Sequence, residues 1–148
     1  MSNTEFINTV SYLTRNSDDA SYWERVQKES KNVKVESVFD ALSVMQVGYL
    51  IGRIKPKKKM CYANALITAL AFHCEYVEGY VNIQGCPIEH AFCKKDGKYF
   101  DPTLEIVDLK LEVTNLEYTS IYERDSNELL KIANSEGTYV PFSRKEYL

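Results

Sequence analysis

The sequence predicts an α+β fold in which N-terminal helices pack on an antiparallel sheet formed later in the chain. Three observations lead to this class. Apolar residues recur at helical spacing through residues 1–54, an Ala- and Leu-rich segment covers 62–74, and β-branched and aromatic residues with turn signals dominate 76–103. Since 148 residues suffice to bury a core, we expect one domain over residues 1–148.

Three helices are expected in the N-terminal part, residues 1–54. Apolar side chains recur every three or four positions in 6–13, and the polar residues that follow can start a second helix over 20–30. A third helix is expected over 37–52, weakened near its end by two glycines. Four lysines and a proline at 55–59 then interrupt the helical pattern.

The middle of the chain changes from helical to strand periodicity. Residues 62–74 contain no Gly or Pro and predict a buried helix, whereas 76–83 and 88–94 predict two strands joined by a turn. A third, short strand is expected at 99–100, and one more helix at 126–135. One helix therefore lies where the helical half and the sheet meet.

The dipeptide Asp96-Gly97, between the second and third predicted strands, is typical of a tight β-hairpin. A two-residue loop would place His90 and Asp101 on the same sheet face as diagonal neighbours, about 7–8 Å apart at the backbone. A three-residue loop would instead turn Asp101 to the opposite face. The length of this loop thus decides whether the two side chains can meet.

Cys61 directly precedes the predicted helix and is the candidate nucleophile. The unpaired N–H groups and the positive dipole end of a helix start favour the thiolate, which is the nucleophilic form. His73 lies 12 residues further along the same predicted helix, about 18 Å away at 1.5 Å per residue, and cannot reach the thiol. His90 is therefore the candidate base, and Asp101 can orient its ring as the third member of a triad.

Four motifs occur in an order that supports the same assignment. Cys61 opens an Ala-rich helix, Tyr-Val-Glu-Gly-Tyr occupies 76–80, His-Ala-Phe occupies 90–92, and Tyr-Phe-Asp-Pro-Thr occupies 99–103. Together they resemble the core of the transglutaminase-like superfamily, part of the wider papain-like cysteine fold, and the resemblance covers 61–103. The residue after the His-Ala pair is Phe here rather than the usual Trp, and no Gly-rich segment precedes the cysteine.

The resemblance implies a catalytic triad and a reaction class. Cys61 would be the nucleophile, His90 the general base and acid, and Asp101 the residue that orients the histidine. The protein would be a cysteine hydrolase or acyltransferase acting on an amide or isopeptide bond, as a cysteine protease, a deamidase or a transamidating enzyme. The backbone N–H of Cys61 would be one oxyanion-hole donor, and Gln46, 15 residues upstream, is no obvious second donor.

Further residues are candidates for lining the substrate cleft, because they flank the triad residues or belong to the four motifs. Each has a structural alternative as a solvent-facing charge, a polar residue at a helix start or a packing side chain. The resemblance also suits a small bacterial or bacteriophage accessory protein. The candidate cleft residues are Tyr62, Asn64, Glu78, Glu89 and Phe92.

Two other functions remain open at this point. The same fold could serve as a non-catalytic binding or inhibitor module that holds a partner in the cleft. A zinc-stabilised domain is the other, because Cys86, His90 and Cys93, with Cys61 or Cys74, offer enough soft ligands. However, the paired Cys-x2-Cys spacing of many structural zinc sites is missing from the sequence, and His90 and Cys93 would face opposite sides of a regular strand.

Composition and charge exclude several classes of protein. With 18 basic and 21 acidic residues the net charge is −3, which argues against a general nucleic-acid binder, and the lysines at 55–59 indicate a solvated loop more than a nucleic-acid patch. The N-terminus shows no secretory signal, and the longest apolar tracts, 44–51 and 63–72, fall short of the roughly 20 residues of a membrane helix. We therefore expect a cytoplasmic protein with reduced thiols, acting on a protein or peptide without a cofactor or metal.

Overall fold

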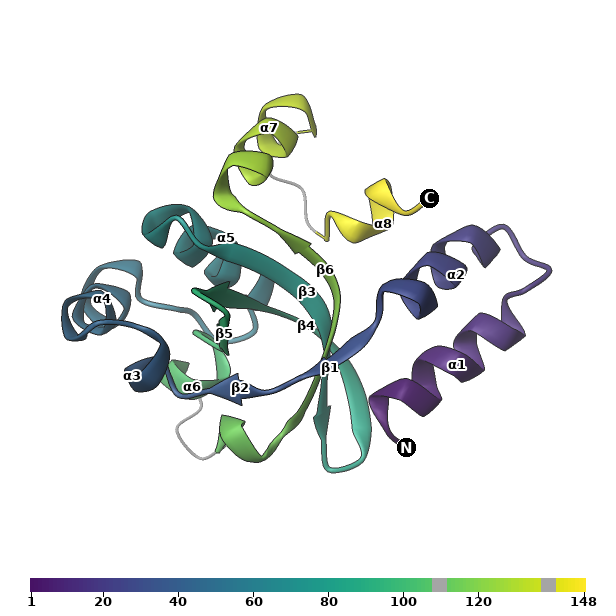
Figure 1. Cartoon of the computed structure of the whole chain (residues 1–148), viewed down its shortest axis with the longest axis horizontal. Helices are drawn as coiled ribbons and strands as arrows, with labels where there is room; N and C mark the ends of the chain where they lie inside the picture. The colour runs from purple at the N-terminus through teal and green to yellow at the C-terminus, as the bar shows by residue number, and fades with distance from the viewer. Residues whose placement is uncertain (108–111, 137–140) are drawn as a thin grey trace.

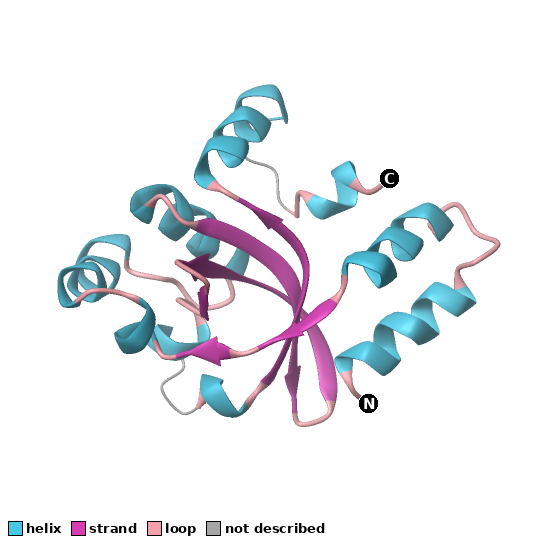
Figure 2. Ribbon diagram, viewed as in Figure 1, coloured by secondary structure: helices cyan, strands magenta, loops and turns pink. Residues whose placement is uncertain are grey.

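The computed structural model describes residues 1–107, 112–136 and 141–148. Within these ranges the chain forms an α+β fold, as expected, with helices packed around a curled and mainly antiparallel sheet (Figure 1 and Figure 2). The strand order across the sheet is β1-β6-β3-β4-β5-β2. The strands are β1 (Lys31–Val33), β2 (Val35–Glu36), β3 (Glu75–Ile83), β4 (Cys86–Lys95), β5 (Lys98–Phe100) and β6 (Glu117–Arg124).

The helices gather in groups around the sheet. In Figure 1, α1 and α2 lie side by side beyond one end of the sheet, α3 and α4 lie together at the other end, and α5 packs against β3 and β4. Across the described ranges, no helix combines the length and the apolar character needed to cross a membrane. The helices are α1 (Asn3–Leu13), α2 (Ala20–Glu29), α3 (Val38–Ala41), α4 (Val44–Tyr49), the π-helix η1 (Leu50–Ile54), α5 (Cys61–Phe72), α6 (Leu104–Val107), the 3-10 helix η2 (Val113–Asn115), α7 (Ser126–Glu136) and α8 (Ser143–Glu146).

The N-terminal part is not entirely helical, which corrects the expectation for residues 1–54. Residues 31–36 contain β1 and β2, which pair with β6 and β5 at opposite edges of the sheet. The β2–β5 pair is parallel, so the sheet is not purely antiparallel. Strands of two or three residues are too short to show periodicity in the sequence. Their pairing partners lie far away along the chain, so local sequence does not indicate the pairing either.

The third expected helix is divided into α3 and α4. Leu42 has an extended backbone (φ −119°, ψ 156°) and ends α3. Ser43 then starts α4 with a capping box: its side chain accepts from the Gln46 N–H at 3.2 Å, and the Gln46 side chain accepts from the Ser43 N–H at 3.0 Å. The Gln46 amide is therefore engaged at a helix start.

The β4–β5 hairpin confirms the predicted two-residue loop. Asp96 and Gly97 both have positive φ angles, 51° and 83°, as a type I′ turn requires, and the two strands pair directly on either side of them. The pairing of β4 with β5 ends at Cys93. Within the described part of the chain, the remainder of β4, which includes His90, has only β3 as a neighbouring strand.

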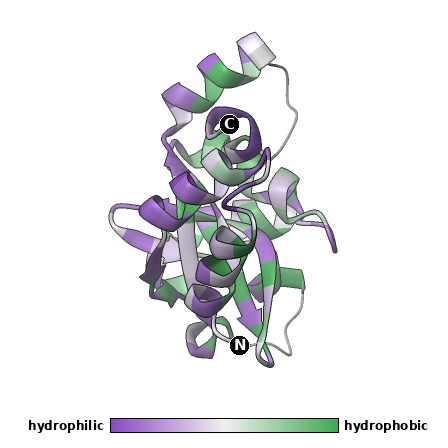
Figure 3. Ribbon diagram, turned by 90° about the vertical axis from the view of Figure 1, so that its right-hand side faces the viewer, coloured by the Kyte–Doolittle hydropathy of each residue, from purple (hydrophilic) through white to green (hydrophobic). Residues whose placement is uncertain are grey.

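The sheet buries side chains on both faces. One face packs against α1, α2, α5 and α7, and the other carries a smaller cluster that includes Val77, Phe92 and Tyr118. Successive residues of β4 alternate between the faces, so that Ala91 and Cys93 face α5 whereas Phe92 faces away. Figure 3, which looks onto α1 and α2, shows hydrophilic and hydrophobic residues alternating around these amphipathic helices.

Gly79 lies where β3 and β6 approach each other too closely for a side chain. A Cβ atom there would lie 1.8 Å from the carbonyl oxygen of Thr119 in β6. The pairing of these two strands shifts register between Glu78 and Gly79. Because Gly79 also pairs with His90 of β4, this close approach helps to fix the strand that carries the histidine.

Candidate active site

His90 and Asp101 form a buried pair where the β4–β5 hairpin ends. Asp101 follows β5 directly, and its Oδ2 atom lies 2.6 Å from Nε2 of His90. The side chains are 6% and 0% exposed, so solvent screens the interaction little. The other carboxylate oxygen, Oδ1, accepts hydrogen bonds from the backbone N–H groups of Thr103 and Leu104, both at 3.0 Å. These two bonds fix the orientation of the carboxylate toward the histidine.

Tyr118 also binds this carboxylate, although the sequence analysis did not select it. Its hydroxyl, on β6, donates a 2.6 Å hydrogen bond to Oδ2 of Asp101, the same oxygen that faces His90. The alternating pattern around Tyr118 marks a strand, but the pattern does not reveal that β6 lies beside β3. The sequence could therefore indicate that Tyr118 is buried and not what it contacts.

Phe92, a predicted cleft residue, supports the histidine from within the core. It is 0% exposed, and its ring stacks on that of His90 with a centroid distance of 6.3 Å and an interplanar angle of 17°. The Tyr118 ring packs edge-on against Phe92 at 5.1 Å. Phe92 therefore holds the imidazole in place and does not line an open cleft.

Cys61 is the first residue of α5, and its half-buried side chain interacts with the His90 ring. Because Nε2 of His90 faces Asp101, the second ring nitrogen, Nδ1, is the one left for the sulfur. The structure thus brings the three predicted triad residues together from a helix start, a strand and the turn after the hairpin. His73, the other histidine, ends α5 in an exposed left-handed conformation.

The charges of the triad stabilise one another. Burial lowers the pKa of His90, but the charge of Asp101 and the hydrogen bonds to Asp101 and Cys61 outweigh it and raise this pKa to about 10. Burial raises the pKa of Asp101, but the charge of His90 and the hydrogen bonds from His90 and Tyr118 outweigh it, so this pKa lies below its ordinary value. At neutral pH the site therefore holds an imidazolium–carboxylate pair next to Cys61.

Asn64 connects two loops that border the triad. Its side chain is buried; Oδ1 accepts from the Lys57 N–H at 3.0 Å, and Nδ2 donates to the Lys57 carbonyl at 2.8 Å. The same Nδ2 donates to the Thr103 hydroxyl at 3.0 Å. This predicted cleft residue therefore ties the loop before Cys61 to the turn that follows Asp101.

Tyr62, Glu78 and Glu89 lie around one small cavity, whose lining includes none of the three triad residues. Tyr62 and Glu89 are each adjacent in sequence to a triad residue, and Glu89 forms an exposed ion pair with Arg144 of α8. Ser143 and Arg144 close the cavity from the C-terminal side. Its volume is about 10 Å³, which is the space of a single water molecule. The three predicted residues therefore share a site that the C-terminal segment covers.

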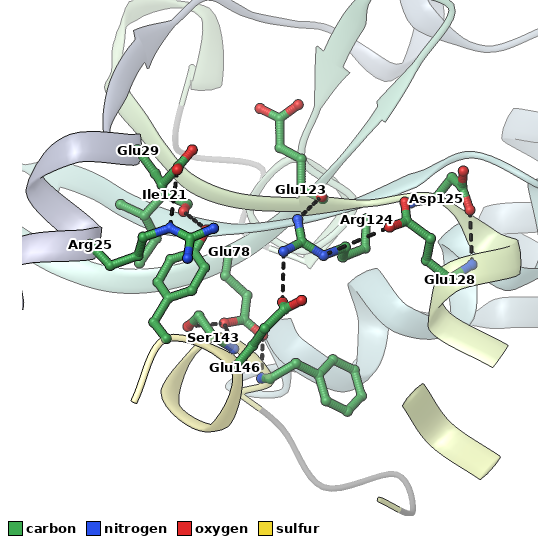
Figure 4. A network of polar contacts seen from close by, with 12 residues as sticks. Arg25, Glu29, Glu78, Ile121, Glu123, Arg124, Asp125, Glu128, Ser143 and Glu146 are labelled. Atoms are coloured by element: carbon green, nitrogen blue, oxygen red, sulfur yellow. Dashed lines mark hydrogen bonds and ion pairs between the residues drawn. The ribbon is translucent and has the colours of Figure 1, made fainter. Parts of the chain in front are cut away.

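Glu78 anchors this C-terminal segment. Its 1% exposed side chain accepts hydrogen bonds from the backbone N–H groups of Phe142 and Ser143 and from the Ser143 hydroxyl (Figure 4). The Tyr76 hydroxyl donates a further bond of 2.6 Å. Burial raises the pKa of Glu78, and these hydrogen bonds offset that effect only in part. A second anchor, shown in the same figure, joins Arg124 of β6 to Glu146 of α8 at 2.7 Å.

The four cysteines differ in accessibility. Cys61 is half-buried, Cys74 and Cys93 are buried, and Cys86 is exposed. Among the residues that the structure describes, no group of three or more His, Cys, Asp or Glu side chains is arranged to hold a metal ion. Cys93 faces α5, on the sheet face opposite to that of His90, as their odd spacing predicts.

The resemblance to the transglutaminase-like superfamily covers four short motifs between residues 61 and 103. In comparisons with known proteins, the chain matches no family model, no curated protein and no solved structure. The resemblance therefore stays a prediction, and the chemistry of the site has to be argued from its side chains.

Proposed function

We propose that this protein is a cysteine-dependent acyl-transfer enzyme with a papain-like, transglutaminase-like core. Its substrate would be an amide or isopeptide bond of a protein or peptide. The observation that carries the proposal is the contact of the Cys61 side chain with His90, whose ring is held by the buried carboxylate of Asp101. A nucleophile, a base and a group that orients the base are the three parts that this chemistry requires.

The charge state of the site suits nucleophilic attack. A protonated imidazole beside a sulfur atom favours the thiolate, and the start of α5 adds a positive dipole end. The thiolate of Cys61 would attack the carbonyl carbon, and the carbonyl electrons would move to the oxygen to give a tetrahedral oxyanion. When the intermediate collapses, the C–N bond breaks and His90 donates its proton to the departing amine. A thioester on Cys61 remains.

The acceptor of the acyl group decides the net reaction. Water, deprotonated by the now neutral His90, would release an acid and regenerate the thiol, which is hydrolysis of a peptide bond or deamidation of a side chain. A primary amine would instead give transamidation. We favour hydrolysis, because water needs no binding site of its own, whereas an amine acceptor does.

The oxyanion would be stabilised at the start of α5. Met60, the N-cap residue, makes no side-chain hydrogen bond to the first turn. The backbone N–H of Cys61 belongs to this first turn, whose N–H groups have no acceptor within the helix. It can therefore donate to the oxyanion, a contribution of about 3 kcal/mol to transition-state stabilisation where such donors have been removed.

A non-catalytic binding or inhibitor module is the second candidate. One observation favours it: Ser143 and Arg144 cover the cavity that three predicted cleft residues line, and the cavity holds no more than one water molecule. In such a module Cys61 would react no faster than an ordinary exposed thiol.

Thiol reactivity separates the two functions. We would measure the alkylation rate of each cysteine with chloroacetamide by peptide mass spectrometry between pH 5 and 9. Exposed Cys86 is the internal control. At pH 6 we expect Cys61 to react about ten-fold or more faster than Cys86, because the His90 imidazolium and the positive end of α5 next to the sulfur favour its nucleophilic attack. The His90→Ala substitution should remove this advantage and leave the rate at Cys86 unchanged.

A second measurement tests acyl transfer itself. After mixing with 4-nitrophenyl acetate, we expect the acetyl group on Cys61 of the wild type and not of the His90→Ala variant. Equal alkylation rates at Cys61 and Cys86, with no acetyl-enzyme, would reject the enzyme and favour the binding module.

A further inference from the structure

We infer that the loop over residues 53–59, named here the basic loop, binds an acidic segment of the protein or peptide on which Cys61 acts. This inference rests on the function proposed above and adds the class of substrate. The loop comprises the last two residues of the π-helix η1 and the segment that leads to α5, and it ends two residues before Cys61. Its basic residues are Arg53, Lys55, Lys57, Lys58 and Lys59.

All five basic residues are exposed. Several of the other cations are paired within the chain: Lys94 pairs with Glu123, and Arg124 pairs with Glu146. In the described ranges, by contrast, no ion pair joins the basic loop to a carboxylate. The positive charge of the loop is therefore available to an anion from another molecule.

The basic loop also gives the chain an uneven charge distribution. Removing its five residues from the 18 basic ones leaves 13, against 21 acidic residues, so the rest of the chain has a net charge of −8. A long polyanion such as a nucleic acid would extend beyond the loop and lie against the rest of the chain, whose net charge repels it. A short acidic stretch of a polypeptide can be held by the loop alone, and the remaining surface would orient it by repulsion.

The backbone of the basic loop is fixed before any ligand arrives. Lys55 and Lys59 have positive φ angles, 52° and 62°, a conformation that side-chain-bearing residues seldom adopt unless their surroundings hold them in it. The Lys55 N–H donates to the Leu50 carbonyl at 2.9 Å, and the two bonds from Asn64 hold the Lys57 backbone from both sides. A preformed loop loses little conformational entropy on binding, which favours affinity.

Asn64 also sets the distance from the basic loop to the triad. Its amide connects Lys57 to Thr103, which lies two residues after Asp101. The loop therefore keeps one position relative to both ends of the triad. An acidic side chain held by the loop would place its neighbouring amide next to Cys61, where the positive end of α5 favours the same negative charge.

The test measures binding of a fluorescein-labelled octaglutamate peptide to the whole protein by fluorescence anisotropy at low salt. The variant replaces Arg53, Lys57 and Lys58 with Gln, which avoids the two positions of positive φ. We expect at least about ten-fold weaker binding, with the difference shrinking as salt screens the charges. A Gly-Ser peptide of the same length should bind neither protein.

A matched control changes the same net charge elsewhere on the surface. It replaces three exposed lysines that form no ion pair within the described residues, and it should retain most of the wild-type affinity, because the charge of the basic loop is unchanged. Equal losses in both triple variants, or none in the loop variant, would overturn the inference. The control positions are Lys28, Lys34 and Lys131.

Two further measurements distinguish a nucleic-acid site from a polypeptide site, and a failure of this inference from a failure of the proposed function. A fluorescein-labelled single-stranded oligothymidylate that binds more tightly than octaglutamate, through the same loop, would identify a nucleic-acid site and overturn the assignment to an acidic polypeptide. Alkylation of Cys61 by chloroacetamide, which is neutral, should be equal in the wild type and the loop variant. Slow alkylation of the wild type would count against the proposed enzyme and leave the binding result for the loop standing.

Discussion

Replacing Asp101 with Asn should remove the charge that keeps His90 protonated. Asp and Asn side chains have the same shape, so the hydrogen bonds from the backbone N–H groups of Thr103 and Leu104 can persist at the amide oxygen of Asn. Burial lowers the pKa of His90, and the carboxylate is the largest of the effects that raise it to about 10. Without the carboxylate, we expect this pKa to fall to or below its ordinary value of about 6.5.

The expected energy follows from that difference. A fall from about 10 to about 6.5 corresponds to about 5 kcal/mol, at about 1.4 kcal/mol for each pH unit. Because the folded-state pKa of His90 is raised, its contribution to the free energy of unfolding is complete below about pH 6.5 and is lost as the pH rises to about 10. The lowered pKa of Asp101 acts at the acidic end of the pH range, where its contribution to the free energy of unfolding disappears as the pH falls below 3.8. The stability gap between wild type and Asp101→Asn should be widest between about pH 4 and 6.5.

The assay is a long-range proton–nitrogen NMR titration of the imidazoles. The chain has only two histidines, and exposed His73 provides an internal reference in each sample. In the wild type, His90 should stay protonated to about pH 10. Urea unfolding at pH 6 and 9.5 would measure the stability gap. If His90 of the wild type loses its proton near or below its ordinary value of about 6.5, the reasoning about the charged pair is refuted.

Three other substitutions test the contacts around the site. Tyr118→Phe removes one hydrogen bond to the triad carboxylate and should lower the free energy of unfolding by about 1.5–3 kcal/mol in urea titrations. Glu78→Gln should speed hydrogen exchange at the start of α8 without slowing alkylation of Cys61. It should also abolish the loss of stability that the raised pKa of Glu78 predicts as the pH rises from 4.5. Gly79→Ala should cost about 3 kcal/mol or more, because its Cβ would overlap the Thr119 carbonyl, whereas Gly48→Ala, in an open position of α4, should stabilise by about 0.5–1 kcal/mol.

Local features of the fold could be predicted from the sequence. The Asp96-Gly97 loop and the change of period after Cys74 depend on residues close together in the chain, so the hairpin and α5 appear where they were expected. The strands β1 and β2 could not be predicted in this way, because their pairing is made with β6 and β5 and leaves little trace in six residues of sequence. Ser43 divides the third expected helix by a local signal, the capping box with Gln46, which helical spacing alone concealed.

The candidate site likewise contains residues that local sequence could predict and residues that only distant contacts place. Cys61, His90 and Asp101 belong to a helix start and a hairpin whose local geometry could be worked out, and the structure brings them together. Tyr118 reaches the same carboxylate from a strand whose register depends on distant partners. Glu78 could be placed on β3, but its bonds to the N–H groups of α8 join residues 64 and 65 positions apart. No local pattern contains such a contact.

The two buried carboxylates of the described residues, Asp101 and Glu78, differ in the charge of their partners. Asp101 faces a positive partner, His90, and its pKa falls despite complete burial. Glu78 receives hydrogen bonds from neutral groups only, and its pKa rises. A carboxylate charge that faces an imidazole favours its protonated form, as Asp101 does for His90. The proposed reaction therefore needs the Asp101 side of the sheet to stay charged, and it can proceed with Glu78 in either state provided that α8 remains in place.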